Sequence, residues 1–580
     1  LGPYGGDYTD HWGYYNGNSV NYKTFESLIT EKNTVENKVT NGLLKEIRYP
    51  TGGYTEFIWE ANKYARVVSA DRTRLENFNG LAGRCRIKEI KSYSGSSSTP
   101  LKKEYFYVLN YLGGPPENYI SSGVLNGKPQ YYTVVPNRKS ADKNLSVEYK
   151  MKSVNGSVSY GYNGQGLHIG YSEVVEKNAD GSYSKYTYTD FGTDINGEQH
   201  FDKPAASVLG WLPGEDRYIT TSTIEQERGK PLSIVHYNNN NVPVKSIQYV
   251  YDNNPERFNS FIKRCQLNLT ISCVGYDALV LGSAFKEFTY RYNVKEEIET
   301  NYAPNPLVTK TTYSYNNIGY ISELKKSQSN GNVLLTKYKY PSDFSYNNSA
   351  TLDACFQDYF NCKTDAEARY NQCRIDCNNS PEYCNQLCPA LRAGLLSGCE
   401  SGYNSCLSQI PGLDLWSKDI ITMKHNFLLS KVVEEQTFLV YSDQSKKTVS
   451  GQIIKYSNQW NNNYLPSKIY EIKTDIPTST IVEASINSYG NFSIHPDYKI
   501  TNSFDKYDSH GNLLQNHNLN DQNMAYIWGY NNSFPIAIVS NAAHNMIYHT
   551  SFEDEPMIKG TVHSFSDTRS KAGKYSLLIS

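Results

Sequence analysis

The sequence predicts an all-β protein of repeated antiparallel hairpins, with one small helical hairpin inserted into it. Tyrosine supplies 51 of the 580 residues and recurs in one phrase, a Gly or Asn-Gly turn followed by an alternating run that ends in Tyr-x-Tyr. Thr, Ser, Asn and Gly are also abundant. Aromatic and β-branched residues suit half-buried strands, while Asn and Gly suit turns. The third observation is a single stretch that holds eight of the eleven cysteines.

The tyrosine phrase is typical of a structural repeat. Because one short hairpin cannot bury a hydrophobic face alone, we expect the copies to add edge to edge into one large wrapped sheet. Asn-Gly and Asp-Gly pairs predict tight hairpin turns whose central residues take positive φ. The copies lie at residues 42–57, 173–190, 229–252, 324–340 and, in the most complete form, 507–514. The turn pairs are Asn155-Gly156, Asn163-Gly164, Asp180-Gly181 and Asn330-Gly331.

The order of these patterns predicts five segments. They are an irregular segment leading into the sheet (1–41), the hairpin sheet (42–348), a cysteine-rich helical hairpin (349–410), the sheet continued (411–546), and the start of a jelly-roll-like module of the carbohydrate-binding kind (547–580). Strand patterning is expected to resume near Lys424. In the last segment Glu553, Asp554 and Glu555 fit a solvated acidic turn better than a calcium site. Because both ends are abrupt, we expect a piece of a longer polypeptide.

The clustered cysteines are arranged as a mirror. On either arm, successive cysteines stand seven, eleven and four residues apart, which keeps all four on one face of a helix. Residues 378–381 offer a turn between the arms, with Ser380 as N-cap and Pro381 at the first helical position. Two antiparallel helices clasped by nested disulfides follow from the mirror. The predicted bridges are Cys355–Cys406, Cys362–Cys399, Cys373–Cys388 and Cys377–Cys384.

Zinc binding is the alternative for these cysteines. The CxxxC pairs fit structural zinc sites, but the outer CxxxxxxC pairs do not, and zinc gives no reason for the mirror. Disulfides indicate an oxidising compartment, at the cell surface or outside the cell. The remaining cysteines are less informative. Cys265 and Cys273 could bridge a local hairpin or form a reduced buried pair, and Cys85 fits an inert core thiol.

Composition argues against several function classes. The 57 basic and 58 acidic residues balance, so the chain lacks the field that holds nucleic acid or an anionic membrane. No apolar run approaches the ~20 residues of a membrane helix. His168 fits a core or pore-lining position, and His510 and His517 fit turn and surface positions better than metal ligands. We expect no catalytic residue, no cofactor and no metal site.

The best copy of the phrase carries a family resemblance. Tyr507, Asp508, Gly511, Asn512 and Leu513 stand in the pattern Tyr-Asp, two variable residues, Gly, a polar residue and Leu. This pattern resembles the repeat unit of YD-repeat (Rhs-type) proteins. Residues 526–542 (YIWGYNNSFPIAIVSNA) resemble the continuation found in Rhs-type proteins of the Bacteroidetes kind. The resemblance covers about four-fifths of the chain, and elsewhere most copies have lost the Tyr-Asp pair.

The resemblance implies a long β-sheet that spirals into a hollow shell. In related proteins such shells enclose a toxic C-terminal domain or form large surface structures. Toxin-bearing members end the shell with an aspartate-based self-cleavage motif, whereas this sequence contains no Asp-Pro pair. We therefore expect no self-processing within these residues.

These expectations define the functional hypotheses. The leading one is a non-catalytic structural or interaction segment of a large exported cell-surface protein. The alternatives are a shell that carries a toxin lying beyond residue 580, and a glycan-binding adhesin whose specificity lies in the module beginning near Tyr548. Expected partners are other segments of the same polypeptide, with secretion machinery, cell-surface proteins or glycans as further candidates. Neither nucleic acid nor membrane insertion is expected.

Overall fold

The chain divides into two compact units, Leu1–Tyr313 and Ser314–Ser580, and each unit is described by itself. The five segment boundaries predicted from the sequence stay predictions. The computed structural model describes residues 8–18, 30–69, 71–95, 98–128, 132–136, 148–152, 167–204, 206–209, 221–271, 278–302, 304–345, 349–376, 381–410, 412–460, 463–547, 564–566 and 576–578. The expected turns at Asn155-Gly156 and Asn163-Gly164 and the acidic run Glu553, Asp554 and Glu555 lie outside these residues.

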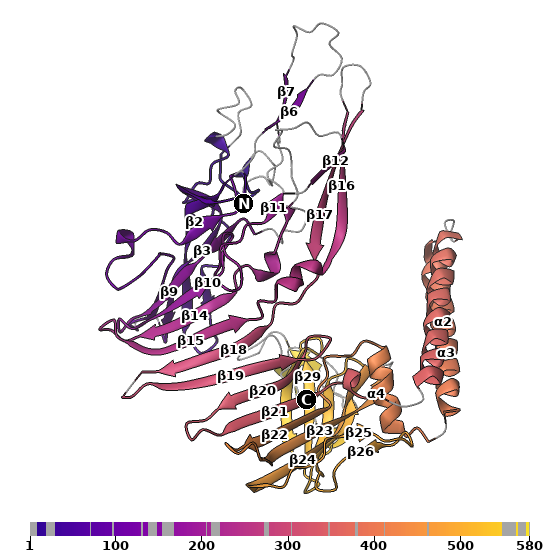
Figure 1. The fold of residues 1–580 in the computed structure, drawn as a ribbon. Helices are drawn as coiled ribbons and strands as arrows, with labels where there is room; N and C mark the ends of the chain where they lie inside the picture. The colour runs from indigo at the N-terminus through magenta and orange to yellow at the C-terminus, as the bar shows by residue number, and fades with distance from the viewer. Residues whose placement is uncertain are drawn as a thin grey trace. The chain divides into compact units, whose positions relative to one another are not determined.

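The first unit is built on a ladder of antiparallel strands, most of them joined to their neighbours by hairpins (Figure 1). Tyrosine pairs stack across adjacent strands, with Tyr54 opposite Tyr93 at 4.3 Å between ring centroids and Tyr183 opposite Tyr237 at 4.7 Å. In order of pairing the strands are β1 (Glu46–Arg48), β2 (Tyr54–Val68), β3 (Leu75–Tyr93), β4 (Leu101–Phe106), β9 (Glu173–Asn178), β10 (Tyr183–Tyr188), β14 (Pro231–Tyr237), β15 (Pro243–Tyr251), β18 (Val294–Asn301) and β19 (Leu307–Tyr315).

Shorter elements flank this ladder. β5 (Gly123–Leu125) pairs parallel to β2 and antiparallel to β8 (Ile169–Tyr171). A separate sheet joins β12 (Ala206–Leu209), β17 (Ala278–Phe288) and β16 (Phe261–Ile271). The remaining pairs are β6 (Tyr132–Pro136) with β7 (Glu148–Lys152) and β11 (Lys203–Pro204) with β13 (Thr221–Ser222), and the 3₁₀ turns are η2 (Pro116–Asn118), η3 (Glu225–Glu227) and η4 (Pro255–Asn259).

The second unit repeats the hairpin ladder and adds the helices. Its strands pair in the order β20 (Ile321–Ser327), β21 (Val333–Lys339), β22 (Glu434–Val440), β23 (Lys446–Trp460), β24 (Asn463–Thr478), β27 (Lys499–Tyr507), β28 (Leu513–Asn518), β29 (Asn523–Gly529) and β30 (Phe534–Ser540). Short elements are β25 (Ser485–Ile486) with β26 (Phe492–Ser493), β31 (Ser564–Ser566) with β32 (Ser576–Leu578), and the turns η5 (Pro341–Asp343) and η6 (His544–Met546). The helices are α2 (Ser349–Asp376), α3 (Pro381–Ser408) and α4 (Leu415–His425).

The all-β class with a disulfide-clasped helical hairpin is confirmed. As the sequence predicts, α3 begins at Pro381, and it continues through Pro389 without interruption. The expectation of strand near Lys424 is wrong, because α4 occupies that position. The Asp414 carboxylate caps this helix by accepting from the Ser417 backbone N–H at 2.7 Å.

α4 supplies the apolar cover of the second unit. Its Ile420 is fully buried with Val433 and Ile453 from the segment around β22 and β23. Trp416 stacks on Tyr470 and on Phe492 at 5.2 and 4.3 Å between ring centroids. A helix with one buried apolar face is what an open sheet needs to form a core. The sequence did not predict this helix, because we expected strands to resume in the segment directly after the cysteine hairpin.

Candidate functional site

The most complete copy of the repeat is a five-residue turn between β27 and β28. The Asp508 backbone N–H donates to the Asn512 carbonyl at 2.9 Å, and the Gly511 N–H donates to the Asp508 carbonyl at 3.1 Å. The Asp508 carboxylate accepts from the backbone N–H groups of His510 and Asn512, both at 2.8 Å. Gly511 has φ of +87°, a conformation that glycine adopts without steric cost. The Asp and the Gly of the motif therefore build the turn.

The other motif residues fasten the turn to its neighbours. The Tyr507 hydroxyl donates to the Pro466 carbonyl on β24 at 2.7 Å. The Asn512 side chain donates to the Asp508 carboxylate at 2.9 Å and to the Asn532 carbonyl at 2.8 Å. Leu513 is the strand partner of Tyr507. The motif is thus an architectural unit in which each residue has a structural contact.

The same turn recurs in both units, including places where the Tyr-Asp pair is absent. In each copy the first N–H donates to the fifth carbonyl, the fourth N–H donates to the first carbonyl, and the fourth residue has positive φ. The first residues of these further copies are Asp10, Tyr49, Asn178, Asp194, Asn238, Asn316, Gln328, Tyr441, Asn487 and Asn518. The repeat is therefore retained as a turn geometry more completely than as a sequence phrase.

Two side-chain solutions hold this turn. An Asp or Asn at the first position accepts from the third and fifth N–H groups, as Asn238 and Asn487 do. In the copies that begin at Asn178 and Gln328, the third position accepts from the fifth N–H instead, as Asp180 and Asn330 do. Turns are present at Asp180-Gly181 and Asn330-Gly331 as expected, and of each pair the glycine alone takes positive φ. The side-chain carboxylate of Asp180 and the side-chain amide of Asn330 each stabilise a five-residue loop.

Tyrosine hydroxyls form the second recurrent contact. Tyr251 at the end of β15 donates to the Pro231 carbonyl at the start of β14, at 2.9 Å. Tyr340 donates to the Ile321 carbonyl at 2.9 Å, and Tyr456 donates to the Val432 carbonyl at 3.0 Å. Burial raises the pKa of Tyr456 to about 12, so its hydroxyl remains a proton donor. Each ring is buried while its polar end is satisfied, which explains the high tyrosine content.

Replacing the fourth-position glycine of one turn tests its role. Gly331 has φ of +81° and nothing within 4 Å of an added Cβ, so Gly331→Ala introduces backbone strain alone. We expect the variant to lose about 1–2 kcal/mol of local stability. The matched control is Gly394→Ala in α3, which also has free space but no positive φ, and which should gain about 0.5–1 kcal/mol. Hydrogen exchange of β20–β21 and of α3 measures the stability changes of the two variants. Changes of the same sign in both would contradict the role assigned to Gly331.

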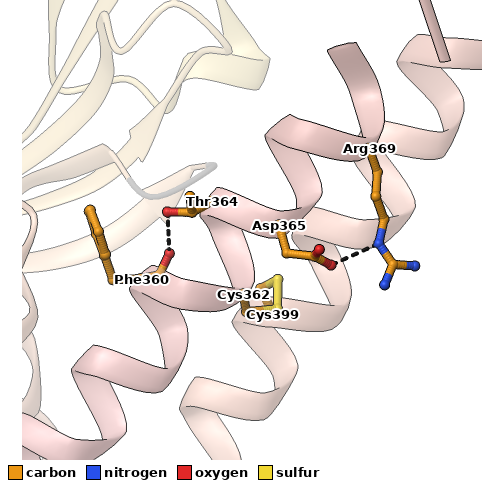
Figure 2. The surroundings of a disulfide bond; sticks show 6 residues. All are labelled: Phe360, Cys362, Thr364, Asp365, Arg369 and Cys399. Carbon is orange, nitrogen blue, oxygen red and sulfur yellow. Dashed lines mark hydrogen bonds and ion pairs between the residues drawn. A yellow bond between two sulfur atoms is a disulfide. The ribbon is translucent and has the colours of Figure 1, made fainter. Parts of the chain in front are cut away.

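The helical hairpin contains the predicted nested bridges, so far as its residues are described. Cys355–Cys406, Cys362–Cys399 and Cys373–Cys388 are disulfides with Cα–Cα distances of 5.8, 5.7 and 5.9 Å. Cys384 is also disulfide-bonded, and its predicted partner Cys377 lies outside the described residues. Figure 2 shows the Cys362–Cys399 bridge joining α2 to α3, with an Asp365–Arg369 ion pair along α2. These bridges exclude zinc as the role of these six cysteines.

The hairpin is packed at its base and exposed along its outer half. Tyr359 stacks on Tyr403 at 4.8 Å, and both are buried with Leu407 and with Ile421 of α4. Between residues 363 and 392 the described buried side chains are Ala366 and Cys388. The outer half therefore depends on its covalent bridges far more than on apolar burial.

Three other residues that the sequence singled out, Cys85, Cys265 and His168, lie in the first unit. Burial raises the pKa of the Cys85 thiol, which disfavours the thiolate that a nucleophile requires. Cys265 is a free, exposed thiol on the continuous strand β16, so neither the local bridge nor the buried pair forms. Its predicted partner Cys273 lies outside the described residues. His168 is a buried residue whose Nε2 lies 2.9 Å from the Gly83 carbonyl oxygen.

His510 and His517 occupy the turn and surface positions expected for them. His510 is exposed beside Asp508, and His517 Nδ1 lies 2.9 Å from the Asp505 carboxylate. Across the part of the chain that the structure describes, no group of three or more His, Cys, Asp or Glu side chains could hold a metal ion. Within the same residues, no helix has the length and apolarity required to cross a membrane.

Asp419 of α4 is a buried carboxyl with a strongly perturbed titration. Burial raises its pKa from 3.8 to about 7, with Lys455 opposing the rise and Asp414 adding to it. Because the folded state holds the proton more tightly than the unfolded state, stability is lost as pH rises from about 4 to 7. Asp419→Asn should therefore stabilise the second unit by roughly 2–4 kcal/mol at pH 8 and by little at pH 4.

The control for this pH dependence has the opposite sign. Hydrogen bonds from Ser445 lower the pKa of the exposed Asp443, so its contribution is present at neutral pH and is lost on acidification. Asp443→Asn should consequently give no gain in the stability of the second unit at pH 8. Urea unfolding of the second unit, measured between pH 4 and 8, separates the two variants. An Asp419→Asn effect independent of pH would contradict the linkage.

Comparisons with known proteins find solved structures of low similarity to this chain. No protein-family model matches the chain, and no curated protein matches it. The crystal structure of TcdB2-TccC3 aligns with 86% of this chain and 25% of its own length, at 8% identity and a TM-score of 0.28. The form without its hypervariable C-terminal region aligns with 86% and 24%, at 8% identity and a TM-score of 0.29. The chain spans about a quarter of these proteins, and TM-scores this low do not establish a common fold.

Proposed function

We propose that this chain is a non-catalytic structural segment of an exported YD-repeat (Rhs-type) protein, in which successive hairpins build the wall of a β-shell. The observation that carries the proposal is the five-residue turn, which recurs in both units with one hydrogen-bond pattern. The tyrosine contacts to neighbouring strands support it, because they fasten adjacent strands, within one hairpin for Tyr251 and Tyr340 and between two hairpins for Tyr507. The repeated residues of this chain form hairpin turns and contacts between strands, which fits the wall of a shell better than an enzyme.

The proposed partners are further hairpins of the same polypeptide. Among the described strands β30 pairs with β29 alone, and its Phe534 and Ile538 are exposed. An apolar strand with one unpaired edge is a template for another strand. The disulfide-bonded hairpin supports export, since such bridges persist in oxidising compartments and are rare in the cytosol.

Electron microscopy of the purified chain tests this function. The expected result is a curved β-wall built from stacked hairpins, with the helical hairpin projecting as a rod. Flat or globular particles without a curved wall would refute the shell. Non-reducing peptide mapping of the protein from its native host tests export separately: bridged cysteines 355 to 406 are expected, and free thiols at these positions would exclude it.

A further inference from the structure

The first unit contains a cavity of about 1250 Å³ that the hairpin repeat does not explain. It lies against β2, β3 and β8, with the residues before β1 forming another side. The residues that matter for its chemistry are aromatic (Tyr14, Tyr15, Trp59, Tyr171), basic (Lys45, Arg84, Arg86) and amide-bearing (Asn37, Asn41, Asn62). No Asp or Glu belongs to the lining formed by the described residues.

A β-bulge places a strained arginine at this cavity. Cys85 pairs with Ala61, but Asn62 pairs with Ala82, so Gly83 and Arg84 are extra residues on β3. Arg84 has φ of +71°, a left-handed conformation that a long L side chain rarely adopts. Bulges and such backbone outliers concentrate at binding sites, where they redirect a side chain. The strain at Arg84 is therefore an observation that points to a ligand.

The neighbouring glycine lets a second wall approach closely. A Cβ on Gly83 would lie 2.7 Å from the Tyr14 ring and 2.8 Å from the Asp10 carboxylate. That carboxylate is buried and accepts from the backbone N–H groups of Trp12 and Tyr14 at 3.0 and 2.9 Å. The Tyr14 wall is thus fixed against the bulge, and the Arg84 guanidinium lies 6.0 Å from the Tyr14 ring centroid.

The cavity has an excess of positive charge. Arg86 is compensated, because its Nε lies 2.7 Å from the Glu60 carboxylate and its guanidinium covers the Tyr107 ring at 4.1 Å. Arg84 and Lys45 are exposed and form no ion pair with a described carboxylate. Two available cations facing a volume without a lining carboxylate favour an anionic ligand.

The remaining lining favours a ligand that carries many hydroxyls and whose rings can lie against an aromatic face. The Trp59 indole N–H is occupied by the Leu44 carbonyl at 2.9 Å, which leaves the ring face for contact. The Asn62 amide is held by the Tyr171 hydroxyl at 2.8 Å and donates to the Gly83 carbonyl at 2.8 Å. Asn37 and Asn41 are exposed and can donate and accept. Aromatic faces with a few placed polar groups are typical of a preformed ligand site.

We propose that this cavity binds a short anionic oligosaccharide whose carboxylate or sulfate groups contact Arg84 and Lys45. The volume exceeds the 300–1,000 Å³ of common small-molecule sites, which fits an oligomer. A single-stranded nucleic acid is the other polyanion that stacks on aromatic rings, but its backbone requires a groove with many cations. Here two are available, on a chain of net charge −1. Only the choice of an extracellular ligand rests on the proposed export.

Calorimetric titration of the 580-residue chain tests this proposal. The probes are an oligogalacturonate carrying carboxylates, a heparin-derived oligosaccharide carrying sulfates, an uncharged chito-oligosaccharide and a single-stranded oligonucleotide. We expect one or both anionic sugars to bind, at least tenfold more tightly than the uncharged sugar, with affinity falling as salt rises. Which sugar binds identifies the anionic group. Preference for the oligonucleotide, or equal binding of the uncharged sugar, would overturn the proposal, as would binding of none.

Two variants and a control make the site assignment falsifiable. Arg84→Gly should weaken binding at least tenfold while the Tm stays equal or rises, because glycine relieves the positive φ. Lys45→Gln should weaken binding several-fold with an unchanged Tm. Lys295→Gln removes an exposed lysine on β18, outside the cavity, and should leave affinity unchanged. Binding that survives Arg84→Gly, or falls equally in Lys295→Gln, would exclude this cavity as the site.

Discussion

Replacing Glu227 with alanine is expected to lower the free energy of unfolding of the first unit by about 3–5 kcal/mol. Glu227 is fully buried on η3, and its carboxylate accepts from Arg257 Nε at 2.8 Å and from the Tyr290 hydroxyl at 2.5 Å. The Ile195 backbone N–H donates to the same carboxylate at 3.3 Å. The large effect follows from what remains: the Arg257 guanidinium stays buried without its nearest counter-charge.

This carboxylate links η3 to the two segments at the end of the β16–β17 ladder, where Phe261 pairs with Phe288. η3, η4 and the residues after β17 converge on it, and the adjacent Arg228 extends the network. Arg228 pairs with the buried Asp202 at 2.9 Å and donates to the Asp190 carbonyl at 2.8 Å. Removal of Glu227 should therefore loosen the connections between hairpins before the hairpins themselves.

The control for Glu227 is an exposed ion pair in the same unit. Glu287 pairs with Arg264, and both side chains are well exposed, so Glu287→Ala should cost at most about 1 kcal/mol. Arg257→Met added to Glu227→Ala should restore part of the loss, because it removes the uncompensated charge. Urea unfolding, with hydrogen exchange in β14 and β18, measures all three. Similar costs for Glu227→Ala and Glu287→Ala would refute the network's importance.

The cysteine order was the part of the sequence from which structure could be read most directly. Spacing alone places cysteines on helix faces, and mirrored spacing allows one nested pairing, so Cys355 could be matched to Cys406 before any coordinates. The turn at Asp508 could be predicted only in part from the sequence. The sequence marks Gly511 as a turn residue, but the side-chain hydrogen bonds that lengthen the loop depend on the backbone path.

Long-range contacts could not be read from the sequence for a physical reason. Glu227, Arg257 and Tyr290 meet through three different connections, and no local pattern records which charged residue becomes buried. The cavity likewise combines residues near 59, 84 and 171, which the pairing of β2 with β3 and of β5 with β2 and β8 brings near one another, with the separate segment around Tyr14. Cys85, expected in the core, is half-buried at the cavity, and the adjacent Arg84 carries the more informative backbone signal.

Reduction of the disulfides is expected to unfold the outer half of the helical hairpin while its base and the sheet remain folded. For a loop of about 15 residues, the sequence separation of Cys373 and Cys388, a bridge stabilises by roughly 3 kcal/mol. Little opposes that loss in the outer half, where Pro389 disfavours helix and few described side chains are buried. At the base, the Tyr359–Tyr403 stack and α4 provide independent packing.

Hydrogen exchange before and after treatment with a phosphine reductant distinguishes the two halves. Amides between residues 363 and 392 should exchange at least tenfold faster after reduction, whereas those of α4 and β22–β24 should be unchanged. The control is the exposed Arg392–Glu367 ion pair between the helices, whose removal by Glu367→Gln should leave exchange nearly unaltered. Uniform loss of protection across the second unit would instead make the bridges essential to the sheet. Persistence of the outer half would make the bridges dispensable for its folding.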